Sequence, residues 1–376
     1  MRQGTWRLLV LLGALATLLA ACGGQAATTE ATGADQAEEA AGELTPVRLQ
    51  LQWVTQSQFA GYFAARDQGF YEEEGLQVEI LEGAVDIVPQ QVVAAGEAEF
   101  GLAWVPKALV SNEEGANLVN VAQVFQRSGT LEVSWAESGI TEPADWAGKQ
   151  VGTWGFGNEF ELTAAIEKFD VPNVEIVQQP FDMSLLLNRE VDAAQAMTYN
   201  EYAQVLEAVN PETGELYQPQ DLSVIDFNEV GTAMLQDAVW VRQDWLAEEG
   251  NEDLTERFLR ASFRGWVFCR ENFEECVDIV LANGPTLGES HQTWMLNEIN
   301  KLIWPSPNGI GVMDEEQWSQ TVEVATSQEV ITEEPPEDTF RTDLAEQAVA
   351  DLEAEDLDVR GEAFEPVEVE LREGGE

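Results

Sequence analysis

The first part of the chain alternates short apolar segments of two different periodicities. Residues 47–53 (Val-Arg-Leu-Gln-Leu-Gln-Trp) alternate apolar and polar side chains, which predicts a half-buried strand. Residues 59–68 carry apolar side chains at helical spacing and are followed by Gly69, a helix-ending residue. The pattern then continues with strands predicted at 75–81, 100–104 and 118–125, and helices at 88–95 and 106–112. Strands and helices that alternate through short connections predict an α/β fold with a largely parallel sheet.

The same pattern starts again after a break at residues 139–143. Strands are predicted at 150–154, 175–178 and 193–199, helices at 159–168, 183–189 and 201–208, a returning strand at 233–242, and final helices at 254–269, 273–282, 293–302 and 315–325. A chain that leaves one α/β lobe, builds a second and returns has two crossovers, which form a hinge beside a cleft. We predict a first lobe of residues 45–136 and 234–345, a second lobe of 137–233, and an acidic C-terminal tail of 346–376.

The N-terminus predicts an export signal. Arg2 and Arg7 precede an apolar run at 8–19, which is too short for a membrane span of roughly 20 residues. Cys22 follows Leu-Ala-Ala, which resembles the bacterial lipobox and implies a signal peptide of residues 1–21 and a lipid on this cysteine. The alternative is an ordinary signal peptide with an incidental cysteine. Residues 22–44 are rich in Gly, Ala, Thr and acidic residues and predict a disordered tether. Together these features predict an extracytoplasmic protein held at the cell membrane.

The charge of the chain is strongly negative. It has 18 basic and 70 acidic residues, and removal of the predicted signal peptide leaves 16 basic residues against the same 70. Such a surface repels nucleic acid and anionic lipid. It also disfavours a phosphorylated or strongly anionic ligand. The single histidine, His291, argues against a His-based hydrolase or a His-rich metal site. We therefore predict neither metal nor cofactor, and interpret His291 as a surface or capping residue.

Two cysteines remain after Cys22. Cys269 and Cys276 are seven residues apart, too far for a disulfide on one continuous helix. Asn272 between them is a plausible N-cap, so two helices can meet there and bring the thiols together. In an oxidising compartment a disulfide is then possible, with two buried thiols as the alternative.

Aromatic and amide residues gather where the predicted strands end. In open α/β sheets the binding crevice lies beyond the carboxyl ends of the strands. The candidate ligand-binding residues at those ends and at the return crossover are Gln52, Trp53, Gln58, Phe59, Trp104, Trp154, Glu159, Tyr199, Asn200, Asp237 and Trp240. Flat aromatic faces beside amides and carboxylates suit a planar heterocycle. The alternatives are core packing for each Trp and helix capping for Asn200 and Glu201.

Several motifs resemble a known family. They are Leu51-Gln-Trp53, Phe59-Ala-Gly-Tyr62, Gly69-Phe-Tyr-Glu-Glu-Glu-Gly75 and Trp154-Gly-Phe-Gly157. They resemble ABC-transporter solute-binding proteins related to thiamine-pyrimidine-precursor synthases, including the pyrimidine-precursor and riboflavin binders. The resemblance covers residues 45 to about 325. It implies the type II periplasmic-binding fold, with two α/β lobes, a two-crossover hinge and C-terminal helices, in agreement with the lobes predicted above.

The resemblance also suggests a function. It implies a monomeric, lipid-anchored binding protein that delivers a planar vitamin to an ABC permease. Riboflavin is favoured because the predicted cleft is rich in Trp and poor in Arg and Lys. A formylaminopyrimidine precursor of thiamine is the second candidate, and a sulfonate the third. An enzyme is disfavoured, because the fungal synthases consume a histidine and use a cysteine-rich motif that this chain lacks near the predicted cleft. A purely structural surface lipoprotein is a further alternative.

Overall fold

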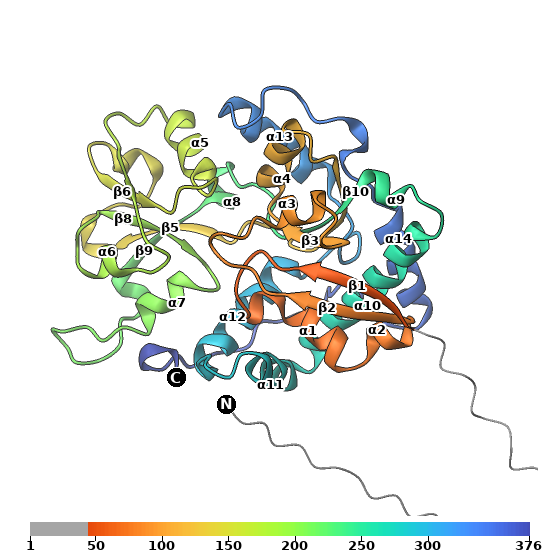
Figure 1. Cartoon of the computed structure of the whole chain (residues 1–376). Helices are drawn as coiled ribbons and strands as arrows, with labels where there is room; N and C mark the ends of the chain where they lie inside the picture. The colour runs from red at the N-terminus through yellow and green to blue at the C-terminus, as the bar shows by residue number, and fades with distance from the viewer. Residues whose placement is uncertain (1–43) are drawn as a thin grey trace, which may run out of the picture. The chain divides into compact units, whose positions relative to one another are not determined.

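The computed structural model describes residues 44–376, and the predicted signal peptide, Cys22 and nearly all of the predicted tether lie outside them. The strands of this part form two five-stranded sheets (Figure 1). The first sheet has the order β2-β1-β3-β10-β4, with β1 Thr45–Gln50, β2 Leu76–Leu81, β3 Phe100–Ala103, β4 Leu118–Gln123 and β10 Ala238–Arg242. The second has the order β7-β6-β8-β5-β9, with β5 Thr130–Trp135, β6 Gln150–Thr153, β7 Glu175–Gln178, β8 Ala193–Met197 and β9 Leu222–Asp226.

Both sheets are mixed in the same way. β10 runs antiparallel to β3 and β4, and β5 runs antiparallel to β8 and β9, whereas the other pairings are parallel. These two antiparallel strands are the ones with which the chain enters each sheet from the other. The first crossover lies between β4 and β5, so the chain enters the second sheet before residue 136, where we expected the first lobe to end. The sequence pattern had predicted neither β5 nor β9. Each sheet with its covering helices is called a lobe below.

Helices cover the sheets of both lobes. Those of the first lobe are α1 Ala60–Asp67, α2 Phe70–Glu73, α3 Pro89–Ala94, α4 Val105–Glu113, α9 Gln243–Leu246, α10 Asn251–Glu271, α11 Phe273–Asn283, α12 Glu289–Ile303 and α14 Asp343–Ala354. Those of the second lobe are α5 Phe160–Lys168, α6 Ser184–Leu187, α7 Glu201–Leu206 and α8 Phe227–Val230. α13 Glu315–Ser327 contacts both α4 and α5. α1 and α10 approach closely because Gly61 faces Gly265, where a Cβ would collide with the Gly61 carbonyl.

The C-terminal segment is not simply an acidic tail. Residues 346–376 were expected to be one, but α14 begins at Asp343 and buries Leu344, Val349 and Leu352 in the largest hydrophobic core. The reason is that its apolar residues recur at helical spacing and form one face, which packs on α10. Beyond α14, the Val367 amide donates to Asn297, and the Gly374 amide donates to the Glu207 carbonyl of the second lobe.

The corner between α10 and α11 contains a disulfide. The two helices meet at Asn272, and Cys269 and Cys276 are bonded there with their Cα atoms 5.0 Å apart. Both cysteines are fully buried. Trp266, Trp304 and Trp318 are also buried. Nowhere in residues 44–376 is there a helix with the length and apolar character needed to cross a membrane.

Candidate functional site

A cavity of about 490 Å³ lies between the two lobes. Its walls come from the segments that follow β1, β2, β3, β6, β7 and β8, all of them parallel strands. Carboxyl ends of parallel strands meet at one edge of a sheet, so both sheets present these edges to the same space. The topology thus places a cavity of ligand size where the strand ends of the two lobes converge.

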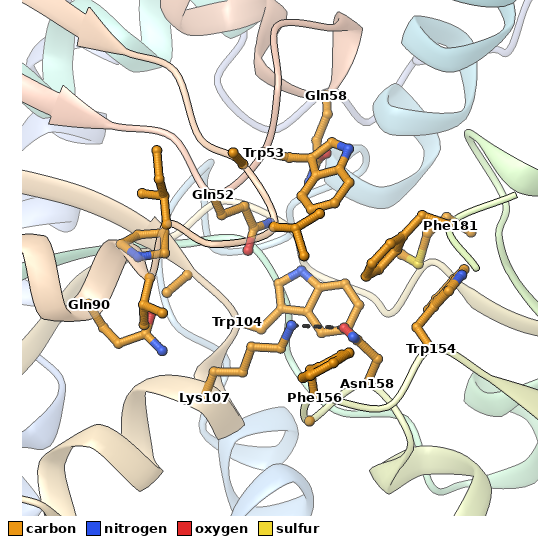
Figure 2. A pocket seen from close by; sticks show the side chains of 18 of the residues that line it. Gln52, Trp53, Gln58, Gln90, Trp104, Lys107, Trp154, Phe156, Asn158 and Phe181 are labelled. Carbon is orange, nitrogen blue, oxygen red and sulfur yellow. Dashed lines mark hydrogen bonds between the residues drawn. The ribbon is translucent and has the colours of Figure 1, made fainter. Parts of the chain in front are cut away.

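Aromatic side chains from both lobes line the cavity (Figure 2). Trp53 of the first lobe contacts Phe181 of the second, with 5.0 Å between the ring centroids. The Phe181 ring also lies nearly parallel to Trp154, with centroids 6.3 Å apart and an interplanar angle of 14°. Trp104 lines the cavity from the first lobe, and Tyr199 from the second. Flat rings that face a common space can hold a planar ligand by stacking.

Asp237 organises the polar wall of the first lobe. Its carboxylate accepts hydrogen bonds from Gln52 Nε2, from Gln58 Nε2 at 2.9 Å and from Trp104 Nε1 at 2.9 Å. Gln56 Nε2 in turn donates to Gln58 Oε1 at 2.7 Å. Burial raises the pKa of Asp237 to about 6, against the lowering effect of these three donors and of Lys107. Asp237 lies behind the wall and fixes side chains that face the cavity.

Lys107 is the one cationic residue of 44–376 that lines the cavity. It lies on α4, and its Nζ donates to Asn158 Oδ1 of the second lobe at 2.8 Å (Figure 2). The same Nζ lies 4.7 Å from the centroid of the Trp104 ring, within range of a cation–π interaction. Burial lowers the pKa of Lys107 to about 8, although Glu159 and Asp237 raise it. The predicted shortage of cations in the cleft therefore has one exception.

The turn between β6 and α5 has an unusual backbone. Gly155, Phe156 and Gly157 have φ values of 70°, 56° and 83°, in the left-handed region that favours glycine. Phe156 nevertheless occupies the middle position, and its side chain lines the cavity while 73% exposed. Gln195 of β8 fixes the turn through two hydrogen bonds. Its Nε2 donates to the Asn158 carbonyl, and its Oε1 accepts from Thr153 Oγ1 at 2.6 Å.

The part of the cavity wall at the start of α7 contacts α12 of the first lobe through His291. Asn200 Oδ1 contacts His291 Nε2 at 3.0 Å, and His291 Nδ1 contacts Glu207 Oε1 at 2.8 Å. His291 therefore bridges α12 and α7, whereas we predicted a surface or capping residue. Glu201 Oε2 accepts from the Met197 amide, and burial raises the pKa of Glu201 to about 7. The side chain of Asn200, the N-cap residue of α7, accepts no capping hydrogen bond from the first amides of the helix, contrary to the alternative that we considered.

The structure brings together seven of the eleven predicted ligand-binding residues. Those that line the cavity are Gln52, Trp53, Gln58, Trp104, Trp154, Tyr199 and Asn200. The other four lie elsewhere. Phe59 is buried in the core of the first lobe, Trp240 is fully buried and donates to the Ala103 carbonyl, and Glu159 accepts from the Gly157 amide within its own turn. Asp237 supports the wall from behind.

Several residues that line the cavity were not among the eleven predicted ligand-binding residues. They are Gln56, Gln90, Lys107, Phe156, Asn158 and Phe181. Phe156 and Asn158 belong to the Gly-rich turn, where the two glycines were a usable signal for a special backbone. Lys107 and Phe181 come from a helix and from a loop beyond β7, and no rule about strand ends points to them. No group of three or more metal-ligating side chains occurs among residues 44–376.

Known proteins share this fold and parts of this sequence. The formylaminopyrimidine-binding protein of Halalkalibacterium halodurans is 25% identical over 289 residues, which cover 74% of this chain and 84% of that protein. The riboflavin-binding protein RibY of Chloroflexus aurantiacus is 26% identical over 336 residues, or 84% and 91% of the two chains. Relatives named 4-amino-5-hydroxymethyl-2-methylpyrimidine phosphate synthase also match, among them one from Legionella pneumophila at 23% identity.

Solved structures agree on the architecture. The periplasmic aliphatic sulphonate binding protein SsuA from Escherichia coli superposes with a TM-score of 0.58 at 13% identity, and the match covers 86% of this chain and 94% of that one. At this identity the likeness shows the fold, which is that of periplasmic solute-binding proteins, as we predicted. The family model described as NMT1/THI5 like matches residues 56–276, more than half of the sequence. Its matched region includes both crossovers and nearly the whole cavity wall, and the chain therefore belongs to the NMT1/THI5-like family.

Proposed function

We propose that this protein is the solute-binding component of an ABC importer and captures a planar heterocycle between its lobes. The observation that carries the proposal is the convergence of Trp53, Trp104, Trp154 and Phe181, from two separate sheets, on one cavity. Closure of the lobes on the ligand would create the form that the permease recognises. Lipid attachment at Cys22, an extracytoplasmic location and a monomeric state belong to the same proposal.

Riboflavin is our first candidate ligand. The cavity volume of about 490 Å³ lies within the range of ligand pockets, about 300–1,000 Å³, which is room for more than one fused ring. Its walls offer ring faces together with the side-chain amides of Gln52 and Gln58, which can read the edge of a heterocycle. The relative named as a riboflavin-binding protein, which aligns over most of both chains, supports this choice.

A formylaminopyrimidine is the second candidate. It is supported by the relative named for that ligand, which also aligns over most of its length. We propose binding rather than turnover for either ligand. The two cysteines of residues 44–376 are joined in a disulfide, and His291 contacts Asn200 from outside the cavity wall. Neither residue type is placed to act on a ligand there.

Titration with riboflavin, the formylaminopyrimidine and taurine tests the proposal. Quenching of Trp fluorescence and isothermal titration calorimetry should detect riboflavin or the pyrimidine at micromolar or lower concentration, and not taurine. Phe181→Ala should weaken binding by about 1–2 kcal/mol, because this ring lines the cavity and is only 38% exposed.

Phe169→Ala is the matched control. Phe169 is 44% exposed at the end of α5 and does not line the cavity, so its removal should leave the affinity unchanged. Absence of binding to both heterocycles would contradict the proposed function. Equal affinities of the two variants would contradict the assignment of the site.

A further inference from the structure

Lys107 differs from the other Lys and Arg residues of 44–376 in its hydrogen-bond partner and in its place beside the cavity. Thirteen of the sixteen Lys and Arg residues in 44–376 form ion pairs with Asp or Glu. Of the other three, Arg127 and Lys168 donate to backbone carbonyls. Of these three, only Lys107 donates to a side chain, the neutral amide oxygen of Asn158, and only Lys107 lines the cavity.

Neither the carboxylates that act on Lys107 nor those that line the cavity form an ion pair with it. Asp237 lies behind the wall and is occupied by three donors, and Glu159 accepts from the Gly157 amide. Of the carboxylates that line the cavity, Glu201 accepts from the Met197 amide, and Glu114 stands at the end of α4. None of them lies within 4 Å of the Lys107 ammonium. Although the sequence has 70 acidic residues, none of those within 44–376 forms an ion pair with this ammonium group.

A partly desolvated ammonium group with one neutral acceptor has hydrogen-bonding capacity to spare. It carries three donors, and only one is used by a side chain of residues 44–376. The Trp104 ring covers one side of Nζ, and the cavity lies beside it. Its unused donors are therefore available to an acceptor on a ligand in the cavity.

We propose that Lys107 Nζ binds a carbonyl oxygen of the ligand, next to the Asn158 amide oxygen, and thereby selects planar heterocycles with a carbonyl group at their edge. This inference rests on the proposed function. A neutral carbonyl is favoured over an anion because the carboxylates of Glu159 and Asp237 already place negative charge near Lys107. A carboxylate or sulfonate would be attracted by one cation and repelled by these two carboxylates.

The arrangement also explains why the two lobes contribute one residue each to this contact. Lys107 belongs to the first lobe and Asn158 to the turn of the second. The ammonium group of Lys107, from the first lobe, polarises the carbonyl oxygen that it binds. The side-chain amide of Asn158, from the second lobe, can donate a hydrogen bond to the same edge of the ligand or accept one from it. The pair can therefore read the edge of the ring only when the lobes are together.

The test measures the dissociation constants of riboflavin and of the formylaminopyrimidine for the wild type, Lys107→Met and Lys107→Arg at pH 6.5 and pH 9.0. Because the pKa of Lys107 is about 8, the wild type should lose roughly tenfold in affinity for its ligand across this interval. Lys107→Met should bind roughly tenfold more weakly at pH 6.5 and lose much less affinity than the wild type between the two pH values. Lys107→Arg should retain most of the affinity at both pH values.

Lys149→Met is the matched control, because Lys149 forms an exposed ion pair with Asp192 and does not line the cavity. Circular dichroism of each variant checks that it is folded. If the wild type binds a heterocycle and Lys107→Met binds it equally well, the role of Lys107 is wrong while the proposed function stands. Tighter binding of taurine or of a carboxylated analogue would overturn the preference for a carbonyl. If the wild type binds neither heterocycle, the proposed function fails and this inference fails with it.

Discussion

Asp237→Asn is the substitution that most directly tests the electrostatics of the cavity wall. Asp237 is buried, and it accepts hydrogen bonds from Gln52, Gln58 and Trp104. Asparagine has nearly the same shape but remains neutral. Its amide oxygen can keep the two donors on Oδ1, whereas its NH₂ group would face Gln58 Nε2. This mismatch is relieved only if the Gln58 and Gln56 amides both turn over, which adds a pH-independent offset of about 1 kcal/mol.

The pH-dependent part of the effect has a definite sign. Burial raises the pKa of Asp237 from 3.8 to about 6 in the folded protein. Between these values the unfolded chain has released its proton and the folded chain retains it, so the free energy of unfolding falls as the pH rises through this window. The full effect is about 3 kcal/mol at 1.36 kcal/mol per unit. About half of it, ~1.4 kcal/mol, falls between pH 5 and pH 8.

The assay is urea unfolding of the wild type and Asp237→Asn at pH 5, 6, 7 and 8, followed by circular dichroism. Because all other titrating groups are common to both proteins, the difference between them isolates Asp237. The variant should gain about 1.4 kcal/mol relative to the wild type between pH 5 and pH 8, whatever its offset.

Asp244→Asn is the control for this series. Asp244 is exposed, and its hydrogen bond with Arg242 lowers the pKa of the Asp244 carboxyl group. The stability that this carboxylate contributes is therefore lost only when the pH falls below the range of pH 5 to pH 8. The difference between Asp244→Asn and the wild type should be constant from pH 5 to pH 8. A constant difference for Asp237→Asn as well would refute the reasoning, because it would mean that Asp237 does not titrate with a raised pKa.

Three further substitutions test other parts of the structure. Phe156→Ala removes an exposed ring from the cavity and should weaken heterocycle binding by about 1 kcal/mol in calorimetry, with unchanged stability; an unchanged affinity would remove Phe156 from the site. Replacement of both Cys269 and Cys276 by Ala opens a loop of about eight residues and should lower the free energy of unfolding by about 2.5 kcal/mol, and a loss below about 1 kcal/mol in urea would contradict this. Leu352→Ala should cost about 2–4 kcal/mol in the same assay, because this side chain of α14 is buried; no loss would restore the expectation of a simple tail.

Periodicity in the sequence predicted most elements but failed where polar side chains are buried. The helices predicted at 254–269 and 273–282 match α10 and α11 within a few residues. The strand β5 was missed although Leu131, Val133 and Trp135 alternate with polar residues. All six of its residues are buried, and Glu132 has a pKa raised well above its ordinary value by burial. A polar residue that faces protein instead of water has no distinct signature in one sequence.

The rule about strand ends found part of the cavity for a physical reason that also explains its failures. Trp53, Trp104 and Trp154 follow parallel strands and line the cavity. β10 runs antiparallel to β3, so the start of β10, and not its end, lies at the edge of the sheet that carries the cavity. Asp237, just before the strand, therefore lies behind the cavity wall, whereas Trp240 lies further along the strand and packs in the core. The direction of β10 could not be known before the pairing of the strands.

The segment that leads into β10 also connects the cavity wall with the two crossovers that form the hinge. Gln236 precedes Asp237, and it joins the two crossovers, because its Nε2 donates to Ser128 and Thr130 and its Oε1 accepts from the Gly129 amide. Asp237 holds the wall through its three donors, so adjacent residues of one chain segment serve the hinge and the wall. A shift of the wall on ligand binding must therefore displace the segment that joins the crossovers. A substitution of Gln236 should accordingly change the affinity for the ligand without touching it, whereas a wall that moved independently of the hinge would leave the affinity unchanged.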